Sequence, residues 1–234
     1  MSDERIDKMI YKKILVFAAH QDDETIGCAA SLKKWATAGA SIRVVFMTDG
    51  NTGIDQSGKY NNNIAQTRMH EARAVSNILG ISEVSTLGIA CQRLSNNQST
   101  FHKVVREIRE FMPELVITHS GNDKHRDHRC TFEIVKEACW KAQENIHADL
   151  GKTWKIEDLW AFEISDLLQR VDFVVDVTDT YKYKKEAFAN YSSQHEVVAG
   201  LSEHMQGLAM VRGYSIGKKY GEAFMRISPF PVSI

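Results

Sequence analysis

The chain of 234 residues is 43% hydrophobic and 25% charged, with a formal net charge of -1. This length and composition allow a sizeable core, and we expect a single domain spanning residues 1–234. The near-neutral charge gives no broad attraction toward nucleic acid or an anionic membrane, so a small molecule is the expected partner.

No stretch approaches the ~20 apolar residues of a membrane span, and the first residues lack the apolar segment of a secretory signal. A cytoplasmic protein without a membrane span is therefore expected. The four cysteines have no close-paired spacing. They predict reduced, mostly buried thiols and neither a disulfide framework nor a four-cysteine zinc site.

Short apolar runs alternate with amphipathic segments through the first part of the chain. Strands are predicted at residues 14–19, 41–47, 83–87 and 114–118. Helices are predicted at residues 25–38, 62–79, 100–111 and 127–143, with Gly39 and Gly80 placed to end the first two. The Gly- and Asn-rich stretch 50–63 is expected to be a long functional loop.

Beyond residue 150 the pattern weakens. Strands are predicted at 158–164 and 172–177 and a helix at 180–191, whereas residues 194–234 remain ambiguous. Strands that alternate with helices predict the α/β class, as a Rossmann-like three-layer fold with a mainly parallel sheet flanked by helices.

The first predicted strand runs directly into AHQDDE, residues 19–24. In a doubly wound sheet, ligands gather outside the carboxyl ends of the strands, where these residues should lie. Adjacent carboxylates repel one another and are costly to bury, so they need water, hydrogen-bond donors or a cation. An imidazole beside carboxylates suits zinc or iron, and a catalytic zinc commonly takes three protein ligands and a water. A further ligand should therefore lie elsewhere.

The best source of that ligand is THSGNDKHRDH, residues 118–128, which also follows a strand and enters a helix. His125 and His128 are three residues apart, so a first helical turn would direct both to one side. His119 is a rival ligand, but a hydrogen-bonding role suits its place at the strand tip equally well.

Each segment also has a simpler explanation. Acidic residues stabilise the first turn of a helix, and the histidines could be solvated surface residues. Because both segments follow strands at the same edge of the predicted sheet, we favour a shared metal site.

Together these residues resemble the PIG-L/LmbE-like family of metal-dependent de-N-acetylases, which act on N-acetylglucosamine-type amino sugars. The family signature Ala-His-Pro-Asp-Asp-Glu is matched at residues 19–24, with Gln21 in place of the proline, and His-x-Asp-His is matched at residues 125–128. Shorter matches extend over residues 14–224. Glutamine at position 21 restricts the backbone less than proline would.

The resemblance implies that His20, Asp23 and His128 bind zinc, with ferrous iron as an alternative. It also implies that Asp22 is the general base that activates a water molecule.

Four further roles are implied in the same way. His125 would stabilise the oxyanion or protonate the leaving amine, with its ring oriented by Asp127. Arg68 and Asp49 would contact the substrate.

The function implied is zinc-dependent removal of the acetyl group from an N-acetylglucosamine-type amino sugar or its conjugate, which releases acetate and a free amine. The resemblance also suggests a homo-oligomer, either a trimer or a hexamer. One alternative is a metal-dependent amidase for another acylated small molecule, such as an antibiotic or a thiol precursor.

Two alternatives are not enzymes. A nucleotide-binding module would need a Gly-rich turn after the first strand, where the acidic residues would instead repel a pyrophosphate. A non-catalytic metal-binding protein would have no need of Asp22.

Overall fold

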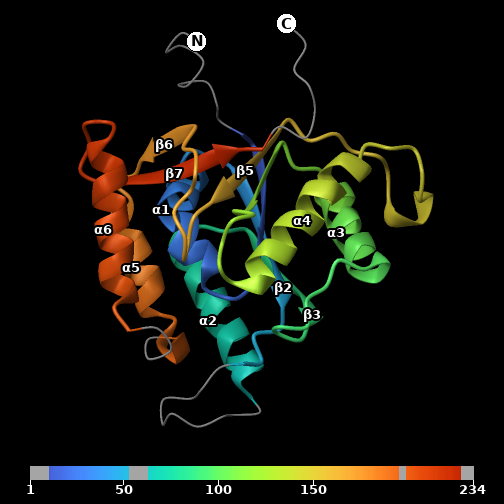
Figure 1. The fold of residues 1–234 in the computed structure, drawn as a ribbon, viewed down its shortest axis with the longest axis horizontal. Helices are drawn as coiled ribbons and strands as arrows, with labels where there is room; N and C mark the ends of the chain where they lie inside the picture. Colours follow the sequence, from blue (N-terminus) through green and yellow to red (C-terminus); the bar gives the residue numbers. More distant parts are fainter. Residues whose placement is uncertain (1–10, 53–62, 195–198, 228–234) are drawn as a thin grey trace, which may run out of the picture.

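The computed structural model describes residues 11–52, 63–194 and 199–227. Within these residues, seven strands form one sheet in the order β3-β2-β1-β4-β5-β7-β6 (Figure 1). The strands are β1 (Lys13–Ala18), β2 (Ser41–Thr48), β3 (Glu83–Ile89), β4 (Leu115–His119), β5 (Asp158–Phe162), β6 (Phe173–Asp176) and β7 (Gly221–Arg226). The helices are α1 (Asp23–Thr37), α2 (Ile64–Leu79), α3 (Gln98–Phe111), α4 (Arg126–Lys141), α5 (Tyr181–Ala189) and α6 (Leu201–Tyr214), with short 3-10 helices at Ala148–Leu150 and Ser192–Gln194.

The sheet is mainly parallel, as predicted. β1 pairs in parallel with both β2 and β4, while β3 and β5 extend the parallel part on either side. Only β7 runs the other way, pairing antiparallel with β5 and β6 in the described chain. The carboxyl ends of β1, β2 and β4 therefore meet at one edge of the sheet, and the segments that follow β1 and β4 become neighbours.

Helices cover both faces of the sheet, which confirms the predicted three-layer α/β fold. Alternate residues of β1 belong to two separate cores: Ile14 and Val16 pack on one face, and Leu15 and Phe17 on the other. Helices α1, α2, α5 and α6 lie over the first face, and α3 and α4 over the second (Figure 1).

Most predicted elements lie within a few residues of the observed ones. Gly39 and Gly80 have φ angles of 96° and 78°, as expected for glycines that end helices. The ambiguous C-terminal stretch contains α6 and β7. Most of the loop predicted at residues 50–63 lies outside the described residues.

A break inside α1 is a feature that the sequence does not predict. Cys28 leaves the helical conformation, with φ of -148° and ψ of 15°. The freed N–H groups of Ala30 and Ser31 donate to the carboxylate of Glu222 on β7, at 3.2 and 2.7 Å. Lys184 pairs with the same buried carboxylate at 2.6 Å. Glu222 thus caps the second half of α1 from across the fold.

Among the helices of the described residues, none has the length and apolar character needed to cross a membrane.

Candidate metal centre

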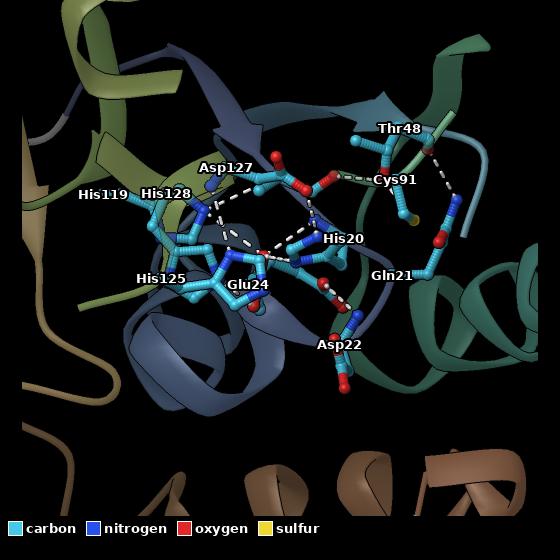
Figure 2. Close-up of polar contacts among 12 residues, drawn as sticks. His20, Gln21, Asp22, Glu24, Thr48, Cys91, His119, His125, Asp127 and His128 are labelled. Carbon is cyan, nitrogen blue, oxygen red and sulfur yellow. Dashed lines mark hydrogen bonds and ion pairs between the residues drawn. The ribbon is translucent and has the colours of Figure 1, made fainter. Parts of the chain in front are cut away.

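Four imidazoles from two distant segments meet at the carboxyl ends of β1 and β4 (Figure 2). His20 follows β1, and His119 is the last residue of β4. His125 lies at the start of α4, with His128 in its first turn. The ring centroids of His20 and His128 are 5.4 Å apart, so the fold joins the two motifs as predicted.

Asp23, the first residue of α1, lies at the middle of this cluster. Its Oδ2 is 3.2 Å from Nδ1 of His20, and its Oδ1 is 3.3 Å from Nε2 of His128. Its Oδ2 also accepts the His20 backbone N–H at 2.7 Å. Asp23 is 3% exposed, so its charge must be balanced inside the protein.

A second carboxylate lies on the far side of each of these imidazoles. Nε2 of His20 is 3.1 Å from Oδ2 of Asp127, and Nδ1 of His128 is 3.1 Å from Oδ1 of Asp123. Each ring therefore presents one nitrogen to Asp23 and the other to an outer carboxylate. This is the arrangement by which metal-binding histidines are commonly fixed in one tautomer and orientation.

The outer carboxylates are themselves held by backbone donors. Asp127 accepts the N–H of Gln92 at 2.8 Å. Asp123 accepts the N–H groups of His125 and Ser165, at 2.8 and 3.1 Å.

Two overlapping groups of residues place their ligand atoms within 4.8 Å of one another: His20, His125 and His128, and Asp23, His119 and His128. His119 is therefore within reach of a shared ion. Its Nε2 lies 3.3 Å from Oδ2 of Asp23, but the same nitrogen accepts the N–H of Ala19 at 2.9 Å, so its lone pair is already engaged. This favours the hydrogen-bonding role for His119.

The electrostatics of the cluster favour added positive charge. Burial alone would raise the pKa of Asp23, but the imidazoles of His128, His119 and His20 hold it well below its usual range. Burial would lower the pKa of His20, but Asp23 and the hydrogen bond with Asp127 raise it to about 10. For His128, Asp23 and Asp123 outweigh burial in the same way and raise the pKa to about 9. A divalent cation would compete with these protons for the same nitrogens.

Asp22 points away from the imidazoles, although it is next to Asp23. Its Oδ1 accepts a hydrogen bond from Nη2 of Arg68 at 3.2 Å. Burial raises the pKa of Asp22 to about 6, against the lowering effect of Arg68. A carboxylate with a raised pKa is suited to take up a proton near neutral pH.

The ring of His125 is fixed by the backbone. Its Nδ1 accepts the N–H of Asp127 at 3.2 Å, which leaves Nε2 to carry the proton of the neutral ring. Burial and the charges of His128 and His20 lower the pKa of His125. A neutral imidazole with an N–H toward the site can donate a hydrogen bond to a developing negative charge.

These groups open on a cavity of about 680 Å³. Its described lining includes His20, Asp22, Asp23, Arg68, His125 and His128, together with Lys124, Gln194 and His204. A cavity of this size accommodates a small ligand of several rings.

Asp127 contacts the His125 ring through its backbone N–H, which donates to Nδ1 at 3.2 Å, while its carboxylate bonds to His20 and to the Gln92 N–H. Its predicted role in orienting His125 stays a prediction. Asp49 is not among the described residues that line the cavity, and its Oδ1 accepts the N–H of Asn51 at 3.1 Å. Arg68 does line the cavity, and its substrate contact stays a prediction.

Sequence reasoning missed Asp123. The sequence clue to Asp123 is its position in the loop between β4 and α4, two residues before His125. Its partner Ser165 lies 42 residues away, which no local pattern reveals.

Comparison with known proteins bears on this site. Residues 15–139, which include both histidine motifs, match the PIG-L family, described as GlcNAc-PI de-N-acetylase. The chain belongs to the PIG-L family. This PIG-L chain is an N-deacetylase, a hydrolase of linear amides.

One relative of this PIG-L chain is a diacetylchitobiose deacetylase from Thermococcus kodakarensis, 24% identical over 94% of the chain and 87% of the relative. The N,N'-diacetylchitobiose deacetylase from Pyrococcus horikoshii has a similar structure, with a TM-score of 0.84 and 22% identity over 98% of this chain and 94% of that one.

The 4-carboxy-2-hydroxymuconate hydratase GalB from Pseudomonas putida has the same fold, with a TM-score of 0.83 and 24% identity over 95% of this chain and 98% of that one. Similar folds at such identities carry different reactions, so the details of the chemistry must be argued from the site itself.

Proposed function

We propose that this chain is a metal-dependent hydrolase that removes the acetyl group from an N-acetylglucosamine-type amino sugar, with residues 1–234 acting as one domain. The observation that carries the proposal is the arrangement around Asp23. Three imidazoles, those of His20, His119 and His128, converge on this carboxylate, and the neighbouring carboxylate, Asp22, faces the cavity separately.

The proposed ligands are His20, Asp23 and His128. Two ligand atoms at ~2.0–2.1 Å from a tetrahedral zinc lie about 3.3 Å apart. Nδ1 of His20 lies 3.2 Å from Oδ2 of Asp23, and Nε2 of His128 lies 3.3 Å from Oδ1, which are separations of that size. Nε2 of His119 is also 3.3 Å from Oδ2, so the choice of His20 as a ligand rests on the family resemblance. This donor set suits zinc, and ferrous iron is the alternative.

When bound, the ion would supply a Lewis acid for the acetamide oxygen and lower the pKa of a water molecule. Asp22 takes the proton from that water as it attacks the carbonyl carbon. The Nε2–H of His125 then donates a hydrogen bond to the oxyanion. The departing nitrogen receives the proton that Asp22 took from the water, and acetate and a free amine leave.

The charges of the cavity support an uncharged sugar as the substrate. Of the Arg and Lys residues in its described lining, Arg68 is paired with the buried Asp22, whereas Lys124 is 69% exposed and makes only a surface contact of 3.8 Å with Asp166. The carboxylates of the centre, together with Asp22, offset a divalent ion and Arg68. A phosphate on the substrate would thus find Arg68 already paired with a carboxylate and only the solvated Lys124 to bind it.

Acetate release from a panel of acetamides tests this function. The metal-loaded protein should deacetylate N-acetylglucosamine or diacetylchitobiose with a kcat/KM roughly 10-fold above that for N-acetylglucosamine 6-phosphate, a difference of about 1.4 kcal/mol in charge interaction. Equal or better use of the phosphorylated sugar would contradict the uncharged substrate. If the metal-loaded protein released acetate from none of these compounds, the deacetylase proposal itself would be contradicted.

Asp123 gives a separate test of the ligand set. Because its carboxylate fixes the ring of His128, Asp123→Asn should weaken metal affinity roughly 10- to 100-fold without removing a ligand. Competition with a chromophoric chelator measures this loss. Asp166→Asn changes a partly exposed carboxylate beside Lys124; it is the matched control and should bind metal as the wild type does. Unchanged affinity in Asp123→Asn would exclude His128 as a ligand oriented by Asp123.

A further inference from the structure

Gln21 lies between His20 and Asp22, yet its side chain belongs to a different environment. Gln21 is 0% exposed and is not among the described residues that line the cavity, whereas His20 and Asp22 both are. Figure 2 shows its amide directed away from the imidazoles and toward Thr48. A buried amide within the motif, turned away from the chemistry, requires an explanation other than substrate or metal contact.

That amide attaches the motif to the end of β2. Nε2 of Gln21 donates to the carbonyl oxygen of Thr48 at 3.0 Å. The N–H and Oγ1 of Thr48 in turn donate to the carbonyl oxygen of Ala19, at 3.0 and 2.8 Å. Gly50 provides the room, because a Cβ on this residue would overlap Oε1 of Gln21. The end of β2 thus holds residues 19–21 from both the main chain and the side chain.

The backbone that follows is in an unfavourable conformation. Asp22 has φ of 134° and ψ of -26°, on the side of the φ range that favours glycine. Such a conformation persists only when its surroundings hold it. Arg68 donates to the carbonyl oxygen of Gln21 at 2.7 Å, and the Asp22 N–H donates to Oε2 of Glu24 at 3.3 Å.

We propose that Gln21 is a positioning residue for Asp22: its hydrogen bond to Thr48 holds the 21–22 peptide in the conformation that turns the Asp22 carboxylate into the cavity. This inference rests on the proposed function of Asp22 as the general base. Proline at this position would restrict its own φ but could not donate to Thr48. In this chain, therefore, a side-chain hydrogen bond supplies the restraint.

The restraint acts on Asp22 separately from the metal ligands. Asp23 is held independently, by the His20 N–H and by the imidazoles around it. Loss of the Gln21 hydrogen bond lets Asp22 relax toward negative φ and move its carboxylate, while Asp23 keeps its contacts. The expected signature is a lower kcat with unchanged metal binding.

Gln21→Met tests this, because methionine has a similar length but no N–H donor. We expect kcat for acetate release to fall roughly 10- to 100-fold, as a misplacement of about 1 Å can cause, with KM and the Kd for zinc unchanged. Gly50→Ala displaces the same amide from the other side and should also lower kcat, so it carries the kcat test if Gln21→Met does not fold. Its KM is not diagnostic, because the new Cβ would also lie 3.1 Å from Cδ of Arg68. The control is Thr86→Val, which removes another donor to the same Thr48 carbonyl, at 2.9 Å, and should keep the wild-type kcat.

The other outcomes are decisive as well. An unchanged kcat in folded Gln21→Met would overturn the inference, as would a Kd for zinc that weakens in parallel with kcat. A purely structural role would lower the midpoint of unfolding and leave kcat per folded molecule intact. A wild-type protein that releases no acetate would overturn the proposed function, a result distinct from equal rates in wild type and variant.

Discussion

Asp22→Asn should lower kcat about 1,000-fold, within the range of ~100- to 10,000-fold for the loss of a general base. Asparagine keeps the volume of the side chain and an oxygen for Arg68, but it cannot accept the proton of the attacking water. Metal content should stay at the wild-type level, because Asp22 faces the cavity and Asp23 faces the imidazoles. Single-turnover acetate release, with metal analysis of the same sample, measures both effects.

Asp176→Asn is the matched control for this change. Asp176 ends β6, and its carboxylate accepts the N–H of Thr178 at 3.0 Å, away from the metal centre. The same replacement of a carboxylate by an amide there should leave kcat unaltered. If Asp22→Asn retained wild-type turnover, another group would have to be the base.

Removal of the metal should have the other large effect. Dialysis against a strong chelator is expected to abolish acetate release, and zinc or ferrous iron should restore it. Metal at 100 times its Kd should stabilise the folded protein by ~2.7 kcal/mol, which corresponds to a rise in Tm of roughly 5–10 °C for a chain of this size. Thermal unfolding with and without metal measures this shift independently of activity.

Asp23→Ala and His128→Ala assign that effect to the proposed ligands. Loss of one of three ligands from a binding free energy of ~10–16 kcal/mol costs on the order of 3 kcal/mol, or about 100-fold in Kd. Both variants should lose most of the rise in Tm. The matched control, His102→Ala, changes a histidine of α3 outside the cluster and should keep the rise. If the double variant Asp23→Ala/His128→Ala bound metal with wild-type affinity, the proposed metal site would be refuted.

Sequence patterns predicted the alternation of strands and helices because hydrophobic periodicity is a local property. Residues 14–19 are apolar on both faces of the strand because β1 lies between two helical layers. A strand buried on both faces can therefore be recognised from its continuous run of apolar residues. The antiparallel β7 was not predicted. Its pairing with β5 and β6 depends on segments far away in the chain, which local periodicity does not report.

In the metal centre, too, local sequence patterns identify the residues, and long-range contacts determine their partners. Residues 19–24 and 125–128 could be selected from the sequence because histidines and carboxylates directly after buried strands are costly without a partner. The partners themselves depend on side-chain direction. The Asp127 carboxylate hydrogen-bonds to the ring of His20, 107 residues away. The Asp123 carboxylate contacts the ring of His128 and also accepts the N–H of Ser165.

What the sequence determined by itself is the set of chemical groups and the edge of the sheet at which they gather, because residue types and the place of each motif after a strand are local patterns. The tertiary structure alone decided which carboxylate faces which imidazole, and that Asp22 and Asp23 point in different directions. That choice depends on the backbone of Asp22, on the hydrogen bond that Arg68 donates to Gln21, and on those that Thr48 and Glu24 accept from Gln21 and Asp22. These groups come together only when the chain is folded.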